Sequence, residues 1–233
     1  MFLISSPRRT ALLATALLSL AACAPVPATA PAVAPVPVAP AVPAAPPPAA
    51  ATTKTTSVLH IDSAQSLIAV TVRRGGVLAR LGHDHVVAAR AITGTVTPDD
   101  NRAEFQFRLD QMTVDEPALR DTAGLTKQPS QDAIDGTRTN MLTKVLDAER
   151  FPLVTVRVVR QGADQPLRAA ITLHGVTRDY DIPAIIGTDQ GAISVSGTVN
   201  LKQTDFGLVP FSVMGGAMAV QDQMELRFVL VAR

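Results

Sequence analysis

The sequence predicts an all-β fold, an antiparallel β-barrel of about eight strands with one helix near the barrel mouth. Six stretches alternate strictly between apolar and polar residues, the pattern of strands with one buried and one solvated face. Parallel strands that are covered on both faces read as continuous apolar runs, so the alternation favours antiparallel pairing. One further stretch has apolar residues three and four positions apart, as an amphipathic helix does.

The predicted strands follow one another along the chain, and two short connections, His174 to Thr177 and Asp189 to Gly191, are typical of hairpins. The residues that alternation assigns to the buried faces are Ile68, Val70 and Val72; Phe105, Phe107 and Leu109; Val154, Val156 and Val158; Leu167, Ala169, Ile171 and Leu173; Ile193, Val195, Val199 and Leu201; and Met224, Leu226, Phe228 and Leu230.

The predicted helix lies between Ser130 and Leu146, and Gly136 weakens it. Phe151-Pro152 ends the turn that follows, because proline excludes α geometry from the residue before it. An antiparallel barrel has two open ends, and this helix has one apolar face to bury. We therefore expect the helix to lie across one barrel mouth.

The N-terminus has the outline of an export signal. Residues 1–22 combine Arg8 and Arg9 with a short apolar run that ends in Leu20-Ala21-Ala22 before Cys23. The run is too short to span a bilayer. The segment resembles the lipobox of bacterial lipoproteins, which implies a lipid on Cys23 and cleavage before it. A plain signal peptide with an accidental cysteine is the alternative.

Composition divides the rest of the chain into two parts. Residues 23–56, which begin with the lipidated Cys23, are rich in alanine and proline and predict a disordered tether, whereas residues 57–233 are long enough for one domain. Ala24 gives no acidic retention signal. We therefore expect a lipid-anchored protein of the cell envelope that faces the periplasm at the outer membrane.

Charge and composition argue against several function classes. The formal net charge is +1, with one tyrosine and no tryptophan, so nothing indicates a nucleic-acid partner. A nucleophile elbow is absent, and the single cysteine is assigned to lipid, so no enzymatic machinery is visible. We expect a binding protein that is not an enzyme and carries no cofactor; its oligomeric state stays open.

Several motifs together resemble the YceI-like family, lipocalin-like β-barrels that bind polyisoprenoid or other long-chain lipids. They are His60-Ile61-Asp62 with Ser66, Phe151-Pro152 before a strand, the hairpin Leu173 to Arg178, Thr204 to Leu208, and the closing strand 220–231. The resemblance covers residues 58–231. It implies a lipid or polyisoprenoid ligand inside a lipocalin-like barrel, and a function as carrier, buffer or stress-related scavenger.

The family resemblance and the alternation together give candidate ligand-binding residues. The inward faces consist mostly of valine, leucine, isoleucine and alanine, whose small side chains favour an unfilled channel. The alternative is a filled core without ligand, which would indicate a structural or protein-interaction domain. The candidate lining residues are Ile68, Val70, Val72, Phe105, Phe107, Leu109, Val154, Val156, Ile171, Leu173, Val195, Val199, Leu226 and Phe228.

Polar candidates come from two places. Arg138 and Asn140 stand where family members carry an Arg-Asp-x-His pattern, so a ligand head group is contacted by them, recognised differently, or not recognised at all. His83 and His85 are two residues apart and share a face if they lie on a strand. They are candidates for head-group contact, for a metal or redox site that would need a third ligand, or for a structural turn capped by Asp84.

Overall fold

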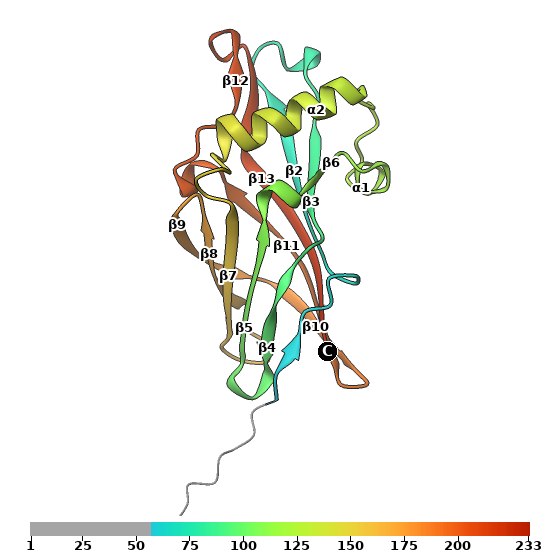
Figure 1. The fold of residues 1–233 in the computed structure, drawn as a ribbon, viewed down its shortest axis with the longest axis vertical. Coiled ribbons are helices and arrows are strands. Elements are labelled where there is room, and N and C mark those ends of the chain that lie inside the picture. The colour runs from blue at the N-terminus through green and yellow to red at the C-terminus, as the bar shows by residue number, and fades with distance from the viewer. Residues whose placement is uncertain (1–56) are drawn as a thin grey trace, which may run out of the picture. The chain divides into compact units, whose positions relative to one another are not determined.

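Antiparallel strands dominate the computed structural model, which describes residues 57–233 (Figure 1). The expected signal peptide of residues 1–22, Cys23 and the tether of residues 23–56 lie outside the described residues. The buried core that the structure describes lies within residues 57–233, and we treat these residues as one folding unit.

The strands form two sheets. In the order of their pairing, the first contains β1 (Leu59–His60), β4 (Thr93–Thr97), β5 (Arg102–Arg108), β7 (Leu153–Arg160), β8 (Leu167–Leu173) and β9 (Val176–Ile182). The second contains β10 (Ala184–Asp189), β11 (Ala192–Lys202), β13 (Met218–Ala232), β2 (Leu67–Gly75), β3 (His85–Ala89) and β6 (Thr113–Val114), and β12 (Ser212–Val213) pairs with β13. All pairs are antiparallel, as predicted.

The predicted helix is confirmed as α2 (Gln131–Asn140), which continues as one π-helical turn over Met141–Val145. Ser130 caps its N-terminus, with its hydroxyl oxygen 3.3 Å from the Ala133 amide nitrogen. Figure 1 shows α2 crossing one end of the two sheets. A second helix, α1 (Pro117–Thr122), was not predicted, and 3-10 turns occupy Ala79–Leu81, Pro98–Asp100, Leu109–Gln111, Thr204–Phe206 and Met214–Gly216.

The two sheets do not close into one hydrogen-bonded ring, which corrects the expectation of a fully closed barrel. The chain passes from β9 directly into β10 at Pro183, which has no amide hydrogen with which to continue a ladder. On another side, β1 reaches the second sheet through an isolated bridge between Ile61 and Ala232. The described residues hold thirteen strands instead of about eight, three of them only two residues long.

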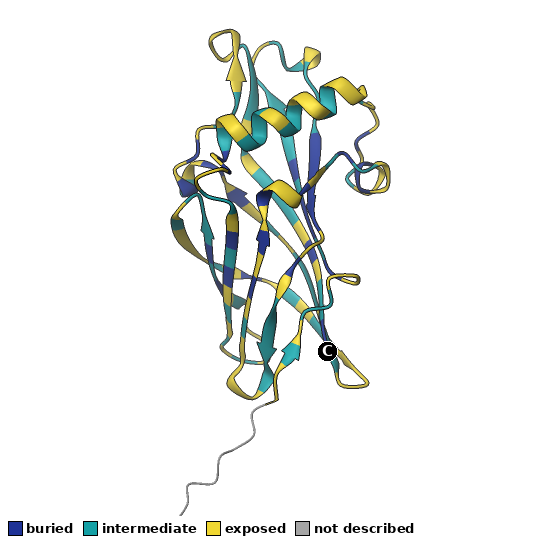
Figure 2. Ribbon diagram, viewed as in Figure 1, coloured by how far each residue is buried: buried dark blue, intermediate teal, exposed yellow. Residues whose placement is uncertain are grey.

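The main core lies between the sheets, as the buried segments in Figure 2 indicate. A smaller cluster lies on the outer face of β2 and β3, where α1 covers Ala69, Val86 and Ala88 with Leu119, and Leu125 closes the patch. Both faces of β3 are therefore buried. This explains why the sequence of β3 does not alternate and was missed as a strand.

The six strands expected from alternation are confirmed as β2, β5, β7, β8, β11 and β13, and both predicted hairpin connections are turns between paired strands. Leu109 differs from the expectation, because it lies in the 3-10 turn after β5 while its side chain stays buried. Within residues 57–233, no helix combines the length and the apolar character needed to cross a membrane.

Candidate functional site

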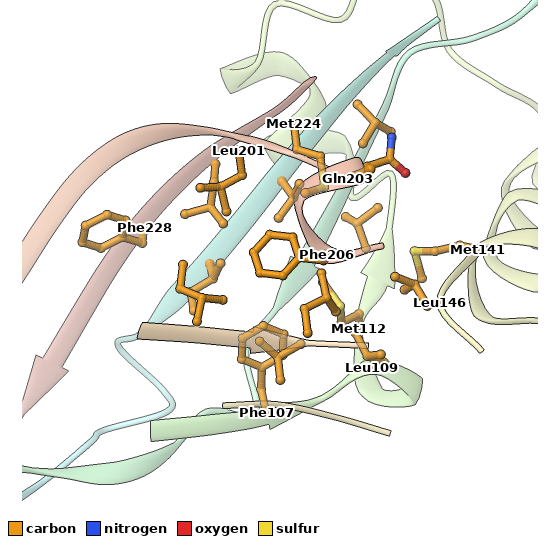
Figure 3. A pocket seen from close by; sticks show the side chains of 18 of the residues that line it. Phe107, Leu109, Met112, Met141, Leu146, Leu201, Gln203, Phe206, Met224 and Phe228 are labelled. Carbon is orange, nitrogen blue, oxygen red and sulfur yellow. The ribbon is translucent and has the colours of Figure 1, made fainter. Parts of the chain in front are cut away.

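A cavity of about 600 Å³ lies between the two sheets and extends beneath α2. Its walls are aliphatic and aromatic side chains from both sheets, from the π-helical turn and from the segment after β11. Figure 3 labels ten of the lining residues, all of them apolar except Gln203: Phe107, Leu109, Met112, Met141, Leu146, Leu201, Gln203, Phe206, Met224 and Phe228. The volume falls within the range of small-molecule pockets.

Thirteen of the fourteen predicted lining residues contribute to this cavity, and only Val199 does not. Val199 instead packs against the buried core. Several lining residues, among them Val70, Val195 and Leu226, are only partly buried although they face the interior. The space between the sheets is thus wider than the side chains that point into it.

Phe206 is completely buried and projects into the cavity from the 3-10 turn Thr204–Phe206 (Figure 3). The pairing of β13 with β2 shifts register between Val220 and Met224. Polar groups of β13 within this irregular stretch accept hydrogen bonds from the turn. The Gln203 side chain donates to the Gln221 carbonyl at 2.8 Å, and the Thr204 hydroxyl donates to Asp222 at 2.7 Å. These bonds fix the turn and aim Phe206 inward.

Tyr180 supports the same turn from the neighbouring sheet. Its hydroxyl donates to the Asp205 carboxylate at 3.1 Å. Burial and this bond to a carboxylate together raise the pKa of Tyr180 to about 12, so the phenol stays protonated at neutral pH. The Thr204 to Leu208 motif therefore joins both sheets at the cavity wall.

Strand alternation could not reveal the lining residues outside strands. Residues of this kind are Met112, Met141, Leu146, Gln203, Phe206 and Leu208. The helical periodicity of Ser130 to Leu146 contained Met141 and Leu146 as apolar residues, and this was the one signal that could have identified them.

Three of the four predicted polar candidates lie at the cavity end beneath α2. His83, His85 and Asn140 line the cavity there, together with Thr137 of α2. Arg138 is not among the lining residues, because its guanidinium group donates to the backbone carbonyls of Asp110 and Met112. The structure therefore gives Arg138 a role in fastening α2 to the segment after β5.

His85 belongs to a buried cluster that the sequence did not indicate. Its Nδ1 lies 2.6 Å from Asp115 Oδ2, and its Nε2 lies 3.3 Å from the Thr137 hydroxyl. Asp115 Oδ1 accepts from Arg120 Nη1 at 2.5 Å and from the Val86 amide at 3.0 Å. Burial alone would raise the pKa of Asp115, but these hydrogen bonds, that from His85 foremost, outweigh it and hold the pKa below its ordinary value.

His83 has a different environment from His85. Burial lowers the pKa of His83, and the positive charges of Lys127 and Arg120 lower it further, so its imidazole is neutral at pH 7. The His83 and His85 rings lie 6.0 Å apart between centroids. Among residues 57–233, no three histidine, cysteine, aspartate or glutamate residues are grouped as metal ligands would be.

The model of the YceI-like domain matches residues 59–232, which is well over half of the chain. The chain belongs to the YceI-like family. The fold of this YceI-like domain is also similar to solved structures. A polyisoprenoid-binding domain from Saccharophagus degradans is 14% identical with a TM-score of 0.55, and the match covers 77% of this chain and 99% of that one.

The structure of BcnA from Burkholderia cenocepacia is 13% identical with a TM-score of 0.51, and the match covers 74% of this chain and 99% of that one. At such identities the similarity shows a shared fold. No protein with a curated description matches the chain. The YceI-like fold and the family resemblance expected from the sequence are thus confirmed.

Proposed function

We propose that this YceI-like domain binds one long apolar lipid of the polyisoprenoid type between its two sheets. The observation that carries the proposal is the unfilled apolar cavity of about 600 Å³. Each methylene moved from water into such a cavity contributes about 0.8 kcal/mol before the entropy cost of binding is subtracted. A slender apolar chain therefore suits these walls better than a polar ligand.

The comparisons support the same class of ligand. The similar structure from Saccharophagus degradans is a polyisoprenoid-binding domain, and it shares the fold over 99% of its length. Within the described residues, the polar side chains at the cavity do not form a metal-ligand cluster. On the strength of the apolar cavity and this relative, we propose a binding protein that acts as carrier, buffer or scavenger and is not an enzyme.

The polar end of the lipid would lie at the α2 end of the cavity. His83, Thr137 and Asn140 line this end and can donate or accept hydrogen bonds, whereas the opposite end, around Val96, Ala103 and Val158, is apolar. We propose that the hydrocarbon chain enters tail first and that its last units reach Val158.

Two neighbouring valines of β7 give a matched test of this binding mode. Val158 lines the cavity, whereas Val159 is exposed on the outer face of the same strand. Val158→Trp should fill the space of at least two methylenes and weaken binding of a long polyprenol by about tenfold or more. Retention of radiolabelled polyprenol by residues 57–233 in gel filtration measures the affinity.

Val159→Trp places the same side chain outside the cavity and should leave the affinity unchanged. Polyprenols too short to reach Val158 should bind both variants equally. Equal binding of the long polyprenol by both variants would contradict the proposed site, provided that circular dichroism shows both to be folded.

We further propose that the protein is a lipoprotein of the cell envelope, anchored through Cys23 and facing the periplasm, with the outer membrane as the better assignment. The lipobox-like sequence before Cys23 supports this. Two or more acyl chains are enough for stable anchoring. Cys23→Ala should move the protein from the membrane fraction to the soluble fraction, and an unchanged membrane fraction would contradict the anchor.

A further inference from the structure

Two loops at the α2 end of the domain expose apolar side chains to solvent. One is the loop 76–82 between β2 and β3, where Val77 is 87% exposed. The other is the hairpin segment 212–217, which comprises β12 and the turn that leads into β13, where Met214 is 69% exposed. We call these two loops the apolar tip. Figures 1 and 2 show the hairpin of β12 projecting beyond α2 as an exposed segment.

The two loops form one surface. The Leu78 amide donates to the Ala217 carbonyl at 2.8 Å, and a Cβ atom at Gly76 would lie 2.4 Å from the same carbonyl oxygen. The backbones thus approach closely and hold Val77 and Met214 on the same part of the domain. An exposed apolar patch of this kind marks a site of interaction with a protein or a membrane.

The apolar tip is continuous with the lipid cavity. Leu81 of the first loop and Val213 of the second are exposed, and both also line the cavity. The cavity therefore reaches the surface of the domain between the two loops. A hydrocarbon chain that leaves the cavity here meets apolar side chains first.

The charges nearest the apolar tip are mostly positive, and the neighbouring Asp84 is paired with Arg74, whose Nε lies 3.7 Å from Asp84 Oδ1. No charged residue occurs from Gly207 to Val220, and Arg80 is the single charge from Gly75 to His83. Lys127 lies beside the first loop, with its Nζ 3.3 Å from the Gly82 carbonyl oxygen. Lys144 lies beside the second, with its Nζ 5.7 Å from the centre of the Phe211 ring. Apolar loops flanked by lysine and arginine fit a bilayer with anionic head groups.

We propose that the apolar tip inserts into the surface of a lipid bilayer, so that the cavity opens directly into the membrane. A long-chain lipid then passes between bilayer and cavity without exposure to water. The insertion itself is independent of cargo, whereas the passage of lipid rests on the proposed function.

A lipid anchor at Cys23 is compatible with this orientation. The tip and the start of the domain lie at opposite ends of β13, whose 15 residues span about 50 Å. A chain of the length from Ala24 to Thr56 reaches about 100 Å when extended. The domain can therefore turn its tip toward the membrane that holds its anchor.

Single tryptophans provide the test, because the chain contains none of its own. Val77→Trp and Met214→Trp place the reporter on the tip, and Ile185→Trp, at a position that is 77% exposed on β10, serves as the matched control. Residues 57–233 of each variant are mixed with vesicles of phosphatidylcholine and phosphatidylglycerol. Both tip reporters should shift their emission to the blue and be quenched by brominated lipid, whereas Trp emission in Ile185→Trp should do neither.

A second substitution separates insertion from an effect of the reporter. Val77→Asp in the Met214→Trp background should lower the vesicle partition by about tenfold or more. Tip emission that stays unchanged with vesicles would overturn the proposal. So would a blue shift that appears without vesicles and grows with protein concentration, since that would identify the tip as a protein interface.

Polyprenol binding from detergent solution, measured on the same variants, separates this proposal from the proposed function. Normal binding from detergent without insertion into vesicles refutes the membrane contact alone. Insertion without polyprenol binding refutes the proposed ligand and leaves the membrane contact standing.

Discussion

At the scale of single residues, Asp115 holds together parts of the chain that are distant in sequence. Its φ of 56° is left-handed, a conformation that aspartate tolerates better than most residues, and turns the chain after β6. The fully buried carboxylate then meets His85 of β3 and Arg120 of α1. Arg120 also donates to the carbonyls of Asp84 and Lys127. One carboxylate therefore organises the outer cover of β3 and one end of the cavity.

Asp115→Asn should lower the free energy of unfolding by about 3 kcal/mol, because it leaves the buried guanidinium of Arg120 without a counter-charge. Asparagine keeps the size of the side chain and the tolerance for positive φ, so the loss of stability reports the removal of the negative charge. Urea unfolding followed by circular dichroism measures it. Asp110→Asn, which removes an exposed ion pair with Arg108, should cost less than about 1 kcal/mol.

The same cluster predicts a pH dependence. The pKa of Asp115 is lower in the folded state than the ordinary value of about 3.9, so its contribution is complete above about pH 4. The contribution is lost as the pH falls through the lower, folded pKa. The stability difference between the wild type and Asp115→Asn should therefore shrink as the pH falls below about 4. A difference that keeps growing as the pH falls below about 4 would contradict this assignment.

The sequence could not indicate this cluster, because nothing local connects residues 85, 115 and 120. The turn at Asp115 and the packing of α1 bring them together. His85 was singled out for its spacing from His83, yet its strongest partner is the distant Asp115. The expectation of head-group contact at His83, His85 and Asn140 stays a prediction, and Arg138 lies away from the cavity.

At the scale of elements, alternation in the sequence identified strands that have one face exposed to solvent. The strands β2, β5, β7, β8, β11 and β13 alternate because the cavity or core lies on one side and solvent on the other. Prediction failed at β3, where α1 covers the outer face, and at short elements such as β1 and β6, whose two residues cannot display a period; alternation also did not identify β4, β9 and β10. Covering elements thus remove the signal that alternation depends on.

The turn between β8 and β9 shows why a predicted hairpin needs its glycine. His174 and Gly175 both have positive φ, 52° and 74°, as a two-residue turn of type I′ requires. A Cβ atom at Gly175 would lie 2.9 Å from Phe151 Cε1, and the Phe151 ring contacts His174 at 4.5 Å between centroids. The Phe-Pro and His-Gly motifs of the YceI-like sequence therefore pack against each other.

Gly175→Ala should destabilise the domain by about 2 kcal/mol, because alanine is strained at this φ and also displaces Phe151. Gly191→Ala is the matched control. It has a φ of 86° in the turn between β10 and β11, but a Cβ there meets no atom within 4 Å. The control should be destabilised only by the strain of alanine at positive φ, which costs about 1 kcal/mol. Thermal unfolding compares the two, and equal losses would argue against the contact with Phe151.

At the scale of the whole domain, the spare space between the sheets is the property that matters for function. The fold class and the family could be predicted, and thirteen of the fourteen residues predicted to line the cavity do line it, because each of these depends on local patterns or motif order. Sheet closure could not be predicted, because it depends on whether the edge strands of the two sheets pair. Here β1 reaches the second sheet only through an isolated bridge. The turn that carries Phe206 likewise depends on an irregularity in the distant β13.

The most direct test of a lipid in this cavity is native mass spectrometry of residues 57–233 exported to the periplasm of a bacterial host and purified without detergent. The account predicts a mass above that of the polypeptide by one lipid molecule, and a long apolar chain in the organic extract. A mass equal to the polypeptide alone, unchanged after incubation with added polyprenol, would contradict it.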